Sequence, residues 1–465
     1  MEGQEKRSTF SGSIGFVLAA AGSAVGLGNI WRFPYLAAKD GGGVFLLCYV
    51  VLALTFGFAL LTTEIAIGRK TGQSPLTAYS FLHKKWGWIG GIACAIPAII
   101  LPYYCVIGGW ILKYLAAYLT GGAAETVADG YFSSFISAQW EPIIWFLVFM
   151  LATALVVYRG VNQGIERLSK VLMPILFLLI IGIALFSLTL KHTDANGVTR
   201  SGVDGFLVYV VPNFEGMTLR SFATILMDAM GQLFYSISVA MGIMITYGSY
   251  VKKETNLVRS VNQIEICDTL VAFMAGMMIV PAVYVFMGTE GMSAGPSLMF
   301  ISLPKVFDAM GSIGLVVAIL FFVTVVFAAL TSSVSVMEAI VSSLMDRTHR
   351  SRQSTTLLVT AIASIAGIVV CLGYNLFYFE LELPNGTVAQ ILDVMDYLSN
   401  YILMPVVAIA TCILVGWVIK PKTIIDEIVL GGHNFHRKNL YIVMVKVVTP
   451  IMLLFLLLQS LGIMF

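Results

Sequence analysis

Long apolar runs separated by short polar segments fill the chain from near its start to near its end. A helix that crosses a lipid bilayer needs about 20 consecutive apolar residues. Lipid cannot satisfy an open backbone, and the alternating pattern of a membrane β-barrel is absent from the sequence, so the runs are expected to be helices. The pattern predicts eleven transmembrane helices, over residues 12–38, 43–68, 88–121, 142–158, 168–190, 221–249, 260–288, 312–345, 355–374, 390–419 and 439–463.

The composition agrees with a membrane protein. Apolar residue types make up 58% of the 465 residues and charged types 11%, whereas a soluble domain carries about 25% charged residues. The mean hydropathy is +0.91. So few charges cannot cover the surface of a protein in water, so the expected partner of most of this surface is the lipid bilayer. We therefore expect an all-α polytopic membrane protein that forms a single domain over 1–465.

Lys and Arg gather in alternate loops, and this asymmetry predicts the orientation of the bundle. The loops on one side carry most of the 27 basic residues, and such loops face the cytoplasm. The N-terminus is then cytoplasmic and, with an odd number of spans, the C-terminus is extracytoplasmic, in a bacterial inner membrane. The net charge of +2 forms no basic stripe, so no nucleic-acid partner is expected.

The patterns that carry enzyme chemistry are missing from this sequence. The five histidines fall in or beside predicted loops, and the six cysteines form no CxxC pair. The sequence also lacks an HExxH motif and a Ser/His/Asp arrangement. A membrane enzyme is therefore not expected.

Two of the predicted spans carry glycines and polar residues at mid-membrane. The first contains AGSAVGLGN at 21–29, and the sixth contains YSISVAMG at 235–242. Glycine costs about 1 kcal/mol relative to alanine inside a helix, and unwound backbone at membrane depth occurs where it is buried or lines a cavity. The alternative is close helix packing through small residues. The first span, with three glycines beside Asn29, favours a broken helix.

The two predicted breaks lie five spans apart, which indicates two related halves. An odd number of spans in each half places the halves in opposite orientation. The first repeat would cover about 12–190 and the second about 221–419, with an extra span at about 439–463. This is the inverted-repeat layout of secondary transporters, whose binding site lies between the broken helices. Free N–H groups at half-helix ends suit a carboxylate, and free carbonyls suit a cation.

The segment GSAVGLGNIWRFP at 22–34, followed by three glycines at 41–43, resembles the signature of the neurotransmitter:sodium symporter family. Supporting segments follow in order along the chain: Glu64 before Gly68-Arg69, Tyr103-Tyr104, Gly231-Gln232, Ser249-Tyr250 and AALTSS at 328–333. The match is closest to bacterial amino-acid transporters of the LeuT fold that lack a twelfth span. It implies a 5+5 inverted repeat with broken first and sixth helices, and sodium-coupled symport by alternating access.

The resemblance implies two sodium sites, and Na⁺ is the only ion expected. Both would offer the oxygen ligands that hard cations prefer. The first site would use the carbonyl of Ala24, the side chains of Asn29, Ser236 and Asp268, and the substrate carboxylate. The second would use the carbonyls of Gly22, Val25 and Ala328 and the hydroxyls of Thr331 and Ser332.

The resemblance also implies a substrate site with a mostly apolar lining, which favours a neutral amino acid with a hydrophobic or aromatic side chain. The carboxylate would meet the amides near Leu27 and Gly28 and the Tyr104 hydroxyl. Family members that carry amines place an aspartate at the position of Gly26, so a glycine favours an amino acid. The expected lining is Ser23, Ala24, Leu27, Gly28, Ile100, Tyr104, Tyr235, Ser236, Ser238, Met241, Ser332 and Val336.

Ionisable residues inside spans indicate function, and the resemblance implies a role for each. Arg32 and Asp396 resemble the extracellular gate pair. Glu64 resembles the buried glutamate that holds the broken sixth span by hydrogen bonds. The intracellular gate is expected at Arg7, Asp346, Ser249 and Tyr250.

Asp268 departs from the pattern of the chloride-dependent members. Those members place an asparagine there and a serine one turn later, where this chain has Ala272. The positions Tyr49, Gln232 and Ser236 of the chloride site are present. We therefore predict that the Asp268 carboxylate replaces chloride and that symport needs sodium but not chloride.

Two other functions on the same fold stay open. One is a carrier of an amino-acid-derived aromatic carboxylate, and the other is a non-transporting amino-acid sensor that has lost one gate. Both expected gates are present in this chain, which argues against the sensor. The protein is expected to act on a small-molecule amino acid as a monomer or a weak homodimer.

Overall fold

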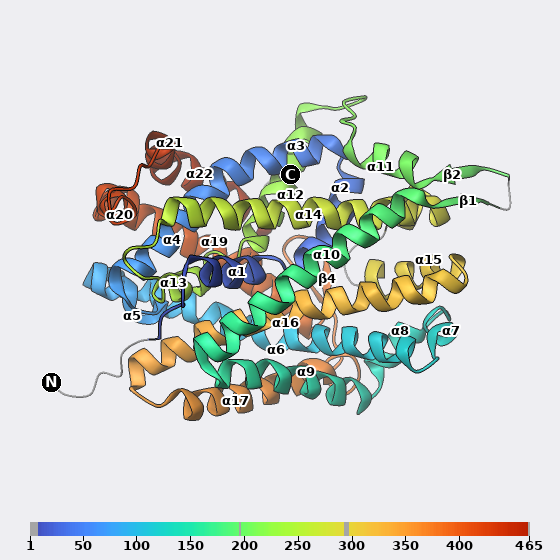
Figure 1. The fold of residues 1–465 in the computed structure, drawn as a ribbon, viewed down its shortest axis with the longest axis horizontal. Coiled ribbons are helices and arrows are strands. Elements are labelled where there is room, and N and C mark those ends of the chain that lie inside the picture. The colour runs from blue at the N-terminus through green and yellow to red at the C-terminus, as the bar shows by residue number, and fades with distance from the viewer. Residues whose placement is uncertain (1–7, 195–196, 293–296, 464–465) are drawn as a thin grey trace.

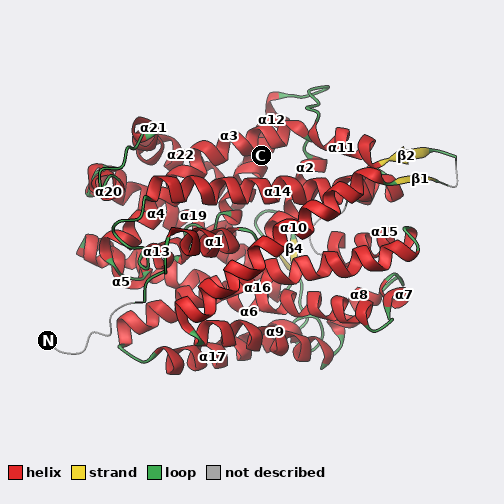
Figure 2. Cartoon of the chain, viewed as in Figure 1, coloured by secondary structure: helices red, strands yellow, loops and turns green. Residues whose placement is uncertain are grey.

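The computed structural model describes residues 8–194, 197–292 and 297–463. In this part the chain forms a bundle of long helices that lie side by side (Figure 1, Figure 2). The strands found there are short antiparallel pairs in the connecting segments (Figure 2): β1 (Lys191–Thr193) with β2 (Thr199–Ser201), and β3 (Leu381–Glu382) with β4 (Val388–Ala389). The described residues therefore match the predicted all-α class.

Each of the eleven predicted spans is helical, and some are divided by a short π-helical turn. In chain order they are α1 (Ser13–Ala24) with α2 (Phe33–Lys39), α3 (Gly43–Leu52) with α4 (Phe58–Thr71), α6 (Gly87–Leu119), α9 (Glu141–Tyr158), α10 (Arg167–Thr189), α12 (Leu219–Ser236) with α13 (Ile243–Gly248), α14 (Leu257–Met287), α16 (Ser312–Thr348), α17 (Arg352–Leu372), α18 (Ile391–Asp396) with α19 (Met404–Ile413), and α21 (Lys438–Val443) with α22 (Thr449–Ser460).

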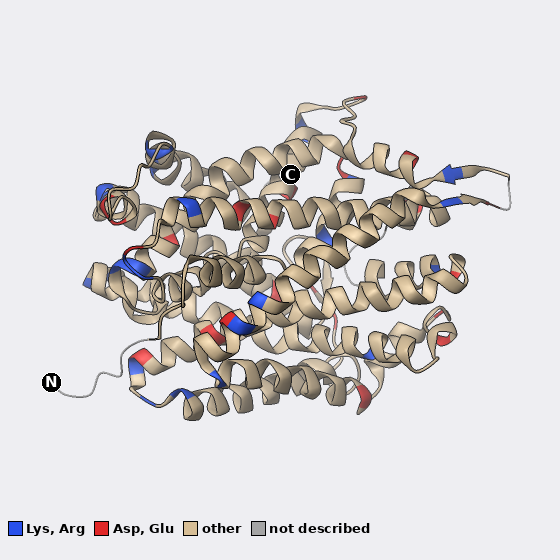
Figure 3. Cartoon of the chain, in the orientation of Figure 1, with Lys and Arg blue, Asp and Glu red and all other residues tan. Residues whose placement is uncertain are grey.

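Shorter helices connect the spans. These are α5 (Pro75–Leu82), α7 (Ala123–Thr126), α8 (Tyr131–Ser137), α11 (Gly202–Val210), α15 (Leu303–Ala309) and α20 (Lys422–Ile428). The helices α5, α13 and α20 lie at one end of the bundle, and β1, β2, α7 and α15 lie at the other (Figure 1). Many Lys and Arg positions lie at the first of these ends (Figure 3), which we call the basic end.

By length and composition, nine described helices qualify as membrane-spanning, and the first span qualifies as a tenth, bent by 53° between α1 and the helix Gly28–Lys39. The sixth predicted span consists of the separate helices α12 and α13. Together they cover residues 219–248, a stretch that is long enough to cross a bilayer. The eleven spans and the two broken helices predicted from the sequence are thus confirmed.

The break in the sixth span has an unusual backbone. Ser238 and Ala240 have φ angles of 54° and 63°, in the left-handed region that costs an L-residue about 1–2 kcal/mol. The chain therefore leaves the helix at Ser236 and re-enters it after Gly242, where φ is 76°. The amide of Ala240, freed from the helix, donates a 2.6 Å hydrogen bond to Glu64 Oε1 on α4.

Candidate functional site

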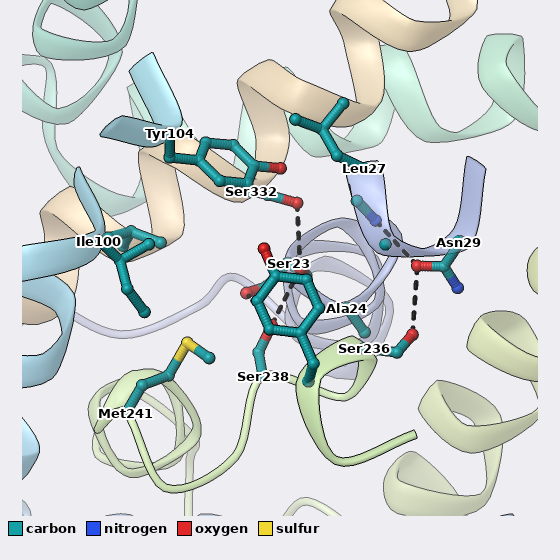
Figure 4. A pocket seen from close by; sticks show the side chains of 14 residues that line it. Ser23, Ala24, Leu27, Asn29, Ile100, Tyr104, Ser236, Ser238, Met241 and Ser332 are labelled. Atoms are coloured by element: carbon teal, nitrogen blue, oxygen red, sulfur yellow. Dashed lines mark hydrogen bonds between the residues drawn. The ribbon is translucent and has the colours of Figure 1, made fainter. Parts of the chain in front are cut away.

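A cavity lies between the breaks of the first and sixth spans, and α6 and α16 complete it (Figure 4). The structure brings all twelve residues expected to bind substrate to this one cavity, together with Gly26 and Asn29. The lining is Ser23, Ala24, Gly26, Leu27, Gly28, Asn29, Ile100, Tyr104, Tyr235, Ser236, Ser238, Met241, Ser332 and Val336. That these residues bind a substrate stays a prediction.

The two sides of the cavity differ in chemistry. Ile100 and Met241 lie on one side, and Asn29 and Ser236 lie on the other (Figure 4). Within the described residues, the buried Tyr104 hydroxyl has no hydrogen-bond partner, and a buried polar group left unpaired costs about 1–3 kcal/mol. The cavity is therefore suited to a ligand with an apolar part and a polar group that can pair with Tyr104.

Gly26 lies beside that hydroxyl. A Cβ atom at this position would lie 2.8 Å from Ser332 Oγ and 3.2 Å from the Tyr104 hydroxyl oxygen. A side chain here would fill the polar part of the cavity. The glycine thus leaves that space to a ligand.

A second hollow adjoins the first, and we call it the outer hollow because it contains Arg32, which is expected at the extracellular gate. Its volume is about 160 Å³, against about 30 Å³ for the cavity between the breaks. Tyr235 lines both, so the small inner cavity and the larger outer one are neighbours. The outer hollow also contains Asp228, Asn400 and Tyr401.

The side chain of Asp268, from α14, is the centre of a buried polar cluster. Its Oδ1 accepts hydrogen bonds from Asn29 Nδ2 at 2.9 Å and Ser236 Oγ at 2.6 Å, and its Oδ2 accepts one from the Tyr49 hydroxyl at 3.1 Å. Asn29 Oδ1 accepts from Ser236 Oγ at 3.1 Å and from the Gly26 amide at 3.2 Å. Asp268 is 0% exposed. No Lys or Arg pairs with it in the described part of the chain, and a buried carboxylate of this kind fits a cation.

The carboxyl end of α1 forms a second group of oxygens with α16. Ser332 Oγ lies 3.1 Å from the Ser23 carbonyl oxygen and 3.4 Å from those of Gly22 and Val25. These carbonyls lie where α1 ends, so they lack helical partners and carry the negative end of the helix dipole. The structure thus places Ser332 among the carbonyls expected to hold the second sodium ion.

Thr331 and Ala328 belong to the same expected set. The Thr331 hydroxyl donates to its own helix, at 3.0 Å to the Phe327 oxygen and 3.1 Å to the Ala328 oxygen. A Cβ atom on Gly22 would lie 3.3 Å from Thr331 Cβ, so α1 and α16 approach closely here. Such back-bonding to the preceding turn is common for a threonine inside a helix.

The outer gate residues do not form an ion pair in the described structure. Asp396 Oδ1 accepts from the Tyr103 hydroxyl at 3.0 Å and from Asn400 Nδ2 at 2.6 Å. The Arg32 guanidinium lies over the Tyr401 ring, 5.6 Å from its centroid. A gate role for Tyr103, Asn400 and Tyr401 was not predicted from the sequence, because it depends on which side chains meet in the folded bundle.

At the basic end, Asp346 Oδ2 accepts from the Ser74 amide at 2.7 Å. Ser249 Oγ donates to the Thr246 carbonyl of its own helix at 2.5 Å. Arg7, the expected partner of Asp346, lies outside the described residues. Of the expected inner pair, the structure therefore describes Asp346 but not Arg7.

The Tyr250 hydroxyl donates at 2.6 Å to Glu338 Oε1. Arg352 donates to both oxygens of the same carboxylate, at 2.6 and 2.9 Å. Glu338 is 0% exposed, so this is a buried pair between α16 and the start of α17. This pair was not predicted from the sequence, although an ionisable residue in the eighth span is itself a signal of function.

Comparison with known proteins shows the family of this chain. The model of the family described as "Sodium:neurotransmitter symporter family" matches residues 7–129 and 132–464. The chain belongs to this family. It is therefore a sodium-dependent transporter with a multi-pass membrane fold, and it is not an enzyme.

Relatives of this symporter come from all three domains of life. The uncharacterized sodium-dependent transporter YhdH of Bacillus subtilis is 34% identical over 470 residues, 99% of each chain. The transporter MJ1319 of Methanocaldococcus jannaschii is 32% identical, over 89% of this chain and 82% of that one. The sodium- and chloride-dependent GABA transporter 2 of Mus musculus is 26% identical, over 82% and 70%.

A solved structure shares the fold of this symporter. The crystal structure of MhsT in complex with L-phenylalanine superposes with a TM-score of 0.85 at 32% sequence identity. The match covers 98% of this chain and 100% of that one. The LeuT-type fold expected from the sequence is confirmed.

Proposed function

We propose that this symporter moves a neutral amino acid with a hydrophobic or aromatic side chain, driven by the sodium gradient. The observation that carries the proposal is the cavity between the two breaks, which has an apolar side at Ile100 and Met241 and an unpaired hydroxyl at Tyr104. MhsT, which shares the fold, is solved with L-phenylalanine, and this supports the same class of ligand here.

The substrate carboxylate would occupy the space left by Gly26. It would accept from the Tyr104 hydroxyl and from the free amides near Leu27 and Gly28, which begin the second half of the broken helix. The ammonium group would face the carbonyls of the breaks and Ser238, whose hydroxyl lies 3.0 Å from the Ser23 carbonyl. The ligand is thus held by groups that belong to both broken helices.

Two sodium ions would bind beside the substrate, one in each oxygen group. The first would pair with the buried Asp268 carboxylate together with Asn29 and Ser236. The second would sit among the Gly22 and Val25 carbonyls, with Ala328, Thr331 and Ser332 on the α16 side. Its binding would require the Thr331 hydroxyl to turn its lone pairs toward the ion. Both ions would then join the two broken spans to their neighbours.

Alternating access would follow from the two gates. We infer that the basic end is cytoplasmic, which places the N-terminus inside and the C-terminus outside a bacterial inner membrane. Substrate and sodium would enter through the outer hollow, and closure would bring Arg32 from Tyr401 to Asp396. Release would then require the Asp346 and Glu338 contacts at the basic end to open. The bundle of spans one, two, six and seven, which draws two spans from each repeat (about 12–190 and 221–419), would rock against the other spans.

Transport is expected to be unchanged when chloride is replaced by gluconate. The Asp268 carboxylate already supplies the negative charge beside the first sodium site, with hydrogen bonds from Ser236 and Tyr49. The measurement is the initial rate of sodium-driven uptake into proteoliposomes in matched chloride and gluconate buffers. A rate that falls with chloride removal contradicts the role given to Asp268.

Equilibrium binding tests the substrate class. Purified protein is titrated with labelled L-leucine in sodium or potassium, and unlabelled L-phenylalanine, L-tryptophan and 3-phenylpropanoate compete. We expect sodium-dependent binding that the amino acids displace and that 3-phenylpropanoate, which lacks the amine, does not. Displacement by 3-phenylpropanoate alone would favour the aromatic-carboxylate carrier, and binding without transport would favour the sensor.

A further inference from the structure

The last turn of α4 contains an arginine that is buried together with its charge. The Arg69 side chain is 0% exposed, and its Nε donates to Glu427 Oε1 of α20 at 2.9 Å. Its Nη1 donates to the Thr255 carbonyl at 2.7 Å, and its Nη2 donates to the Glu427 carbonyl. Lys253 donates to the same Glu427 oxygen at 2.8 Å. The Glu427 side chain is 5% exposed, so removing its charge leaves a buried guanidinium unpaired.

These contacts join α4 to the loop that follows α13. Thr255 and Lys253 lie in the segment between α13 and α14, and Lys253 also donates to the Arg69 carbonyl at 2.8 Å. The helices α4, α13 and α20 lie at the same end of the bundle (Figure 1). Arg69 therefore holds the loop that follows α13. We call α13 the inner half of the broken sixth span.

The same helix holds α13 along its length. A Cβ atom on Gly68 would lie 2.0 Å from the Ile245 carbonyl oxygen, and one on Gly248 would lie 2.3 Å from the Ile65 carbonyl oxygen. Only glycine lets two backbones approach this closely. Packing of α13 against α4 is thus close at two heights, with one glycine on each helix.

The start of α13 is held by α4 as well. Glu64 accepts from the Ala240 amide at 2.6 Å, just before α13 begins. Between this point and α12 lies the break, where Ser238 and Ala240 have left-handed backbones. The inner half is thus attached to α4 just before its start, along its length and through the loop that follows it. The break separates it from α12.

We propose that Arg69 and Glu427 are positioning residues that fasten α13 to α4 and thereby keep Ser238 and Met241 in place in the cavity. This inference rests on the proposed function for its transport readout and goes beyond it by assigning a role to the helix α20. The pair touches neither substrate nor sodium. The pair acts by raising the fraction of molecules in which α13 is packed on α4, with Ser238 and Met241 in place in the cavity.

The test compares Glu427→Gln with wild type in two measurements. Hydrogen–deuterium exchange of the amides at 243–256 reports whether α13 and its loop are held, without any need for transport. The KM for sodium-driven uptake reports the fraction of molecules with a formed site, because partial formation weakens apparent affinity in proportion. We expect Glu427→Gln to speed exchange and to raise KM, each about tenfold, and Glu427→Asp, which keeps the charge, to lie in between.

Glu265→Gln is the matched control. It breaks a second Arg–Glu pair, the 3.2 Å contact from Arg437 to α14, which involves neither α4's last turn nor α13. We expect wild-type exchange at 243–256 and wild-type KM. A purely structural loss would lower the amount of folded protein and the maximal rate but leave KM unchanged.

Wild-type exchange and wild-type KM in Glu427→Gln would overturn the inference. If Glu427→Gln fails to fold, the same two readouts on Glu427→Asp decide, with unchanged values overturning it. A wild-type protein that takes up no amino acid would overturn the proposed function instead, and the exchange measurement would then decide on the fastening of α13 independently.

Discussion

Asp268→Asn is expected to lower the sodium affinity of transport about 100-fold or more. A buried charge pair that loses one partner is destabilised by about 3–5 kcal/mol, and about 1.4 kcal/mol corresponds to tenfold in affinity. Asp268 is 0% exposed, so water cannot replace the lost charge. Asparagine keeps the size and can still bond to Ser236 and Tyr49. The change therefore isolates the charge from the packing.

The measurement is the initial uptake rate as a function of sodium concentration. Glu265→Gln serves as the control, because it neutralises a carboxylate on the same helix that is paired with Arg437 rather than left for an ion. A second arm repeats the titration in chloride and gluconate. An Asp268→Asn variant with the sodium dependence of the wild type would contradict the assignment of the first sodium site to this carboxylate.

Gly26→Asp is expected to abolish uptake of neutral amino acids, with a fall of roughly 1000-fold. The new carboxylate would lie beside Ser332 and Tyr104, because a Cβ atom at this position would lie 2.8 and 3.2 Å from their hydroxyl oxygens. It would face the substrate carboxylate across about 4 Å, where two like charges repel by about 4 kcal/mol at the effective dielectric constant of a protein surface. It would also pair with the Tyr104 hydroxyl in place of the substrate.

Gly26→Ala separates charge from volume in the same assay. Its methyl group would meet the Ser332 and Tyr104 hydroxyls but would carry no charge, so a smaller loss than with aspartate is expected. Both variants are measured for L-leucine uptake and for binding of an amine without a carboxylate. Equal losses in Gly26→Ala and Gly26→Asp would show that the space alone matters, and would contradict the placement of the substrate carboxylate at this glycine.

The sequence alone predicts the two breaks with unequal strength. The first break is marked by three glycines beside Asn29, a pattern that few stable helices carry. The second contains Ala240, whose φ of 63° is rare for alanine, so composition gives little sign of it. Its stability comes from Glu64 on a distant helix, and such a contact is visible only once the helices are packed.

The sequence pattern also could not predict which side chains contact the ionisable residues of the spans. Ionisable residues in spans marked Arg32, Asp396 and Glu64 as functional, and the same rule applied to Glu338 would have found it. Which group meets each of them depends on the packing. Asp396 is held by Tyr103 and Asn400, and Glu338 by Arg352.

Resemblance to the family supplied what spacing could not, namely which residues meet around the cavity. Ile100, Tyr104 and Met241 come from segments far apart in the chain, and each taken by itself reads as core packing. The structure brings them to one cavity with the breaks. Arg69 was noticed in the sequence only as part of a family segment, and Glu427 was not noticed, because the pairing of the two depends on burial that the pattern does not show.

Sodium-driven accumulation of an amino acid in proteoliposomes tests the central claim most directly. The purified protein is reconstituted with potassium inside, and labelled L-leucine is added with either sodium or potassium outside. We predict accumulation above the outside concentration with sodium, none with potassium, and collapse when a sodium ionophore removes the gradient. Equal uptake in sodium and potassium, or no uptake of leucine, phenylalanine or tryptophan in sodium, would contradict the proposal that this chain is a sodium-coupled carrier of hydrophobic amino acids.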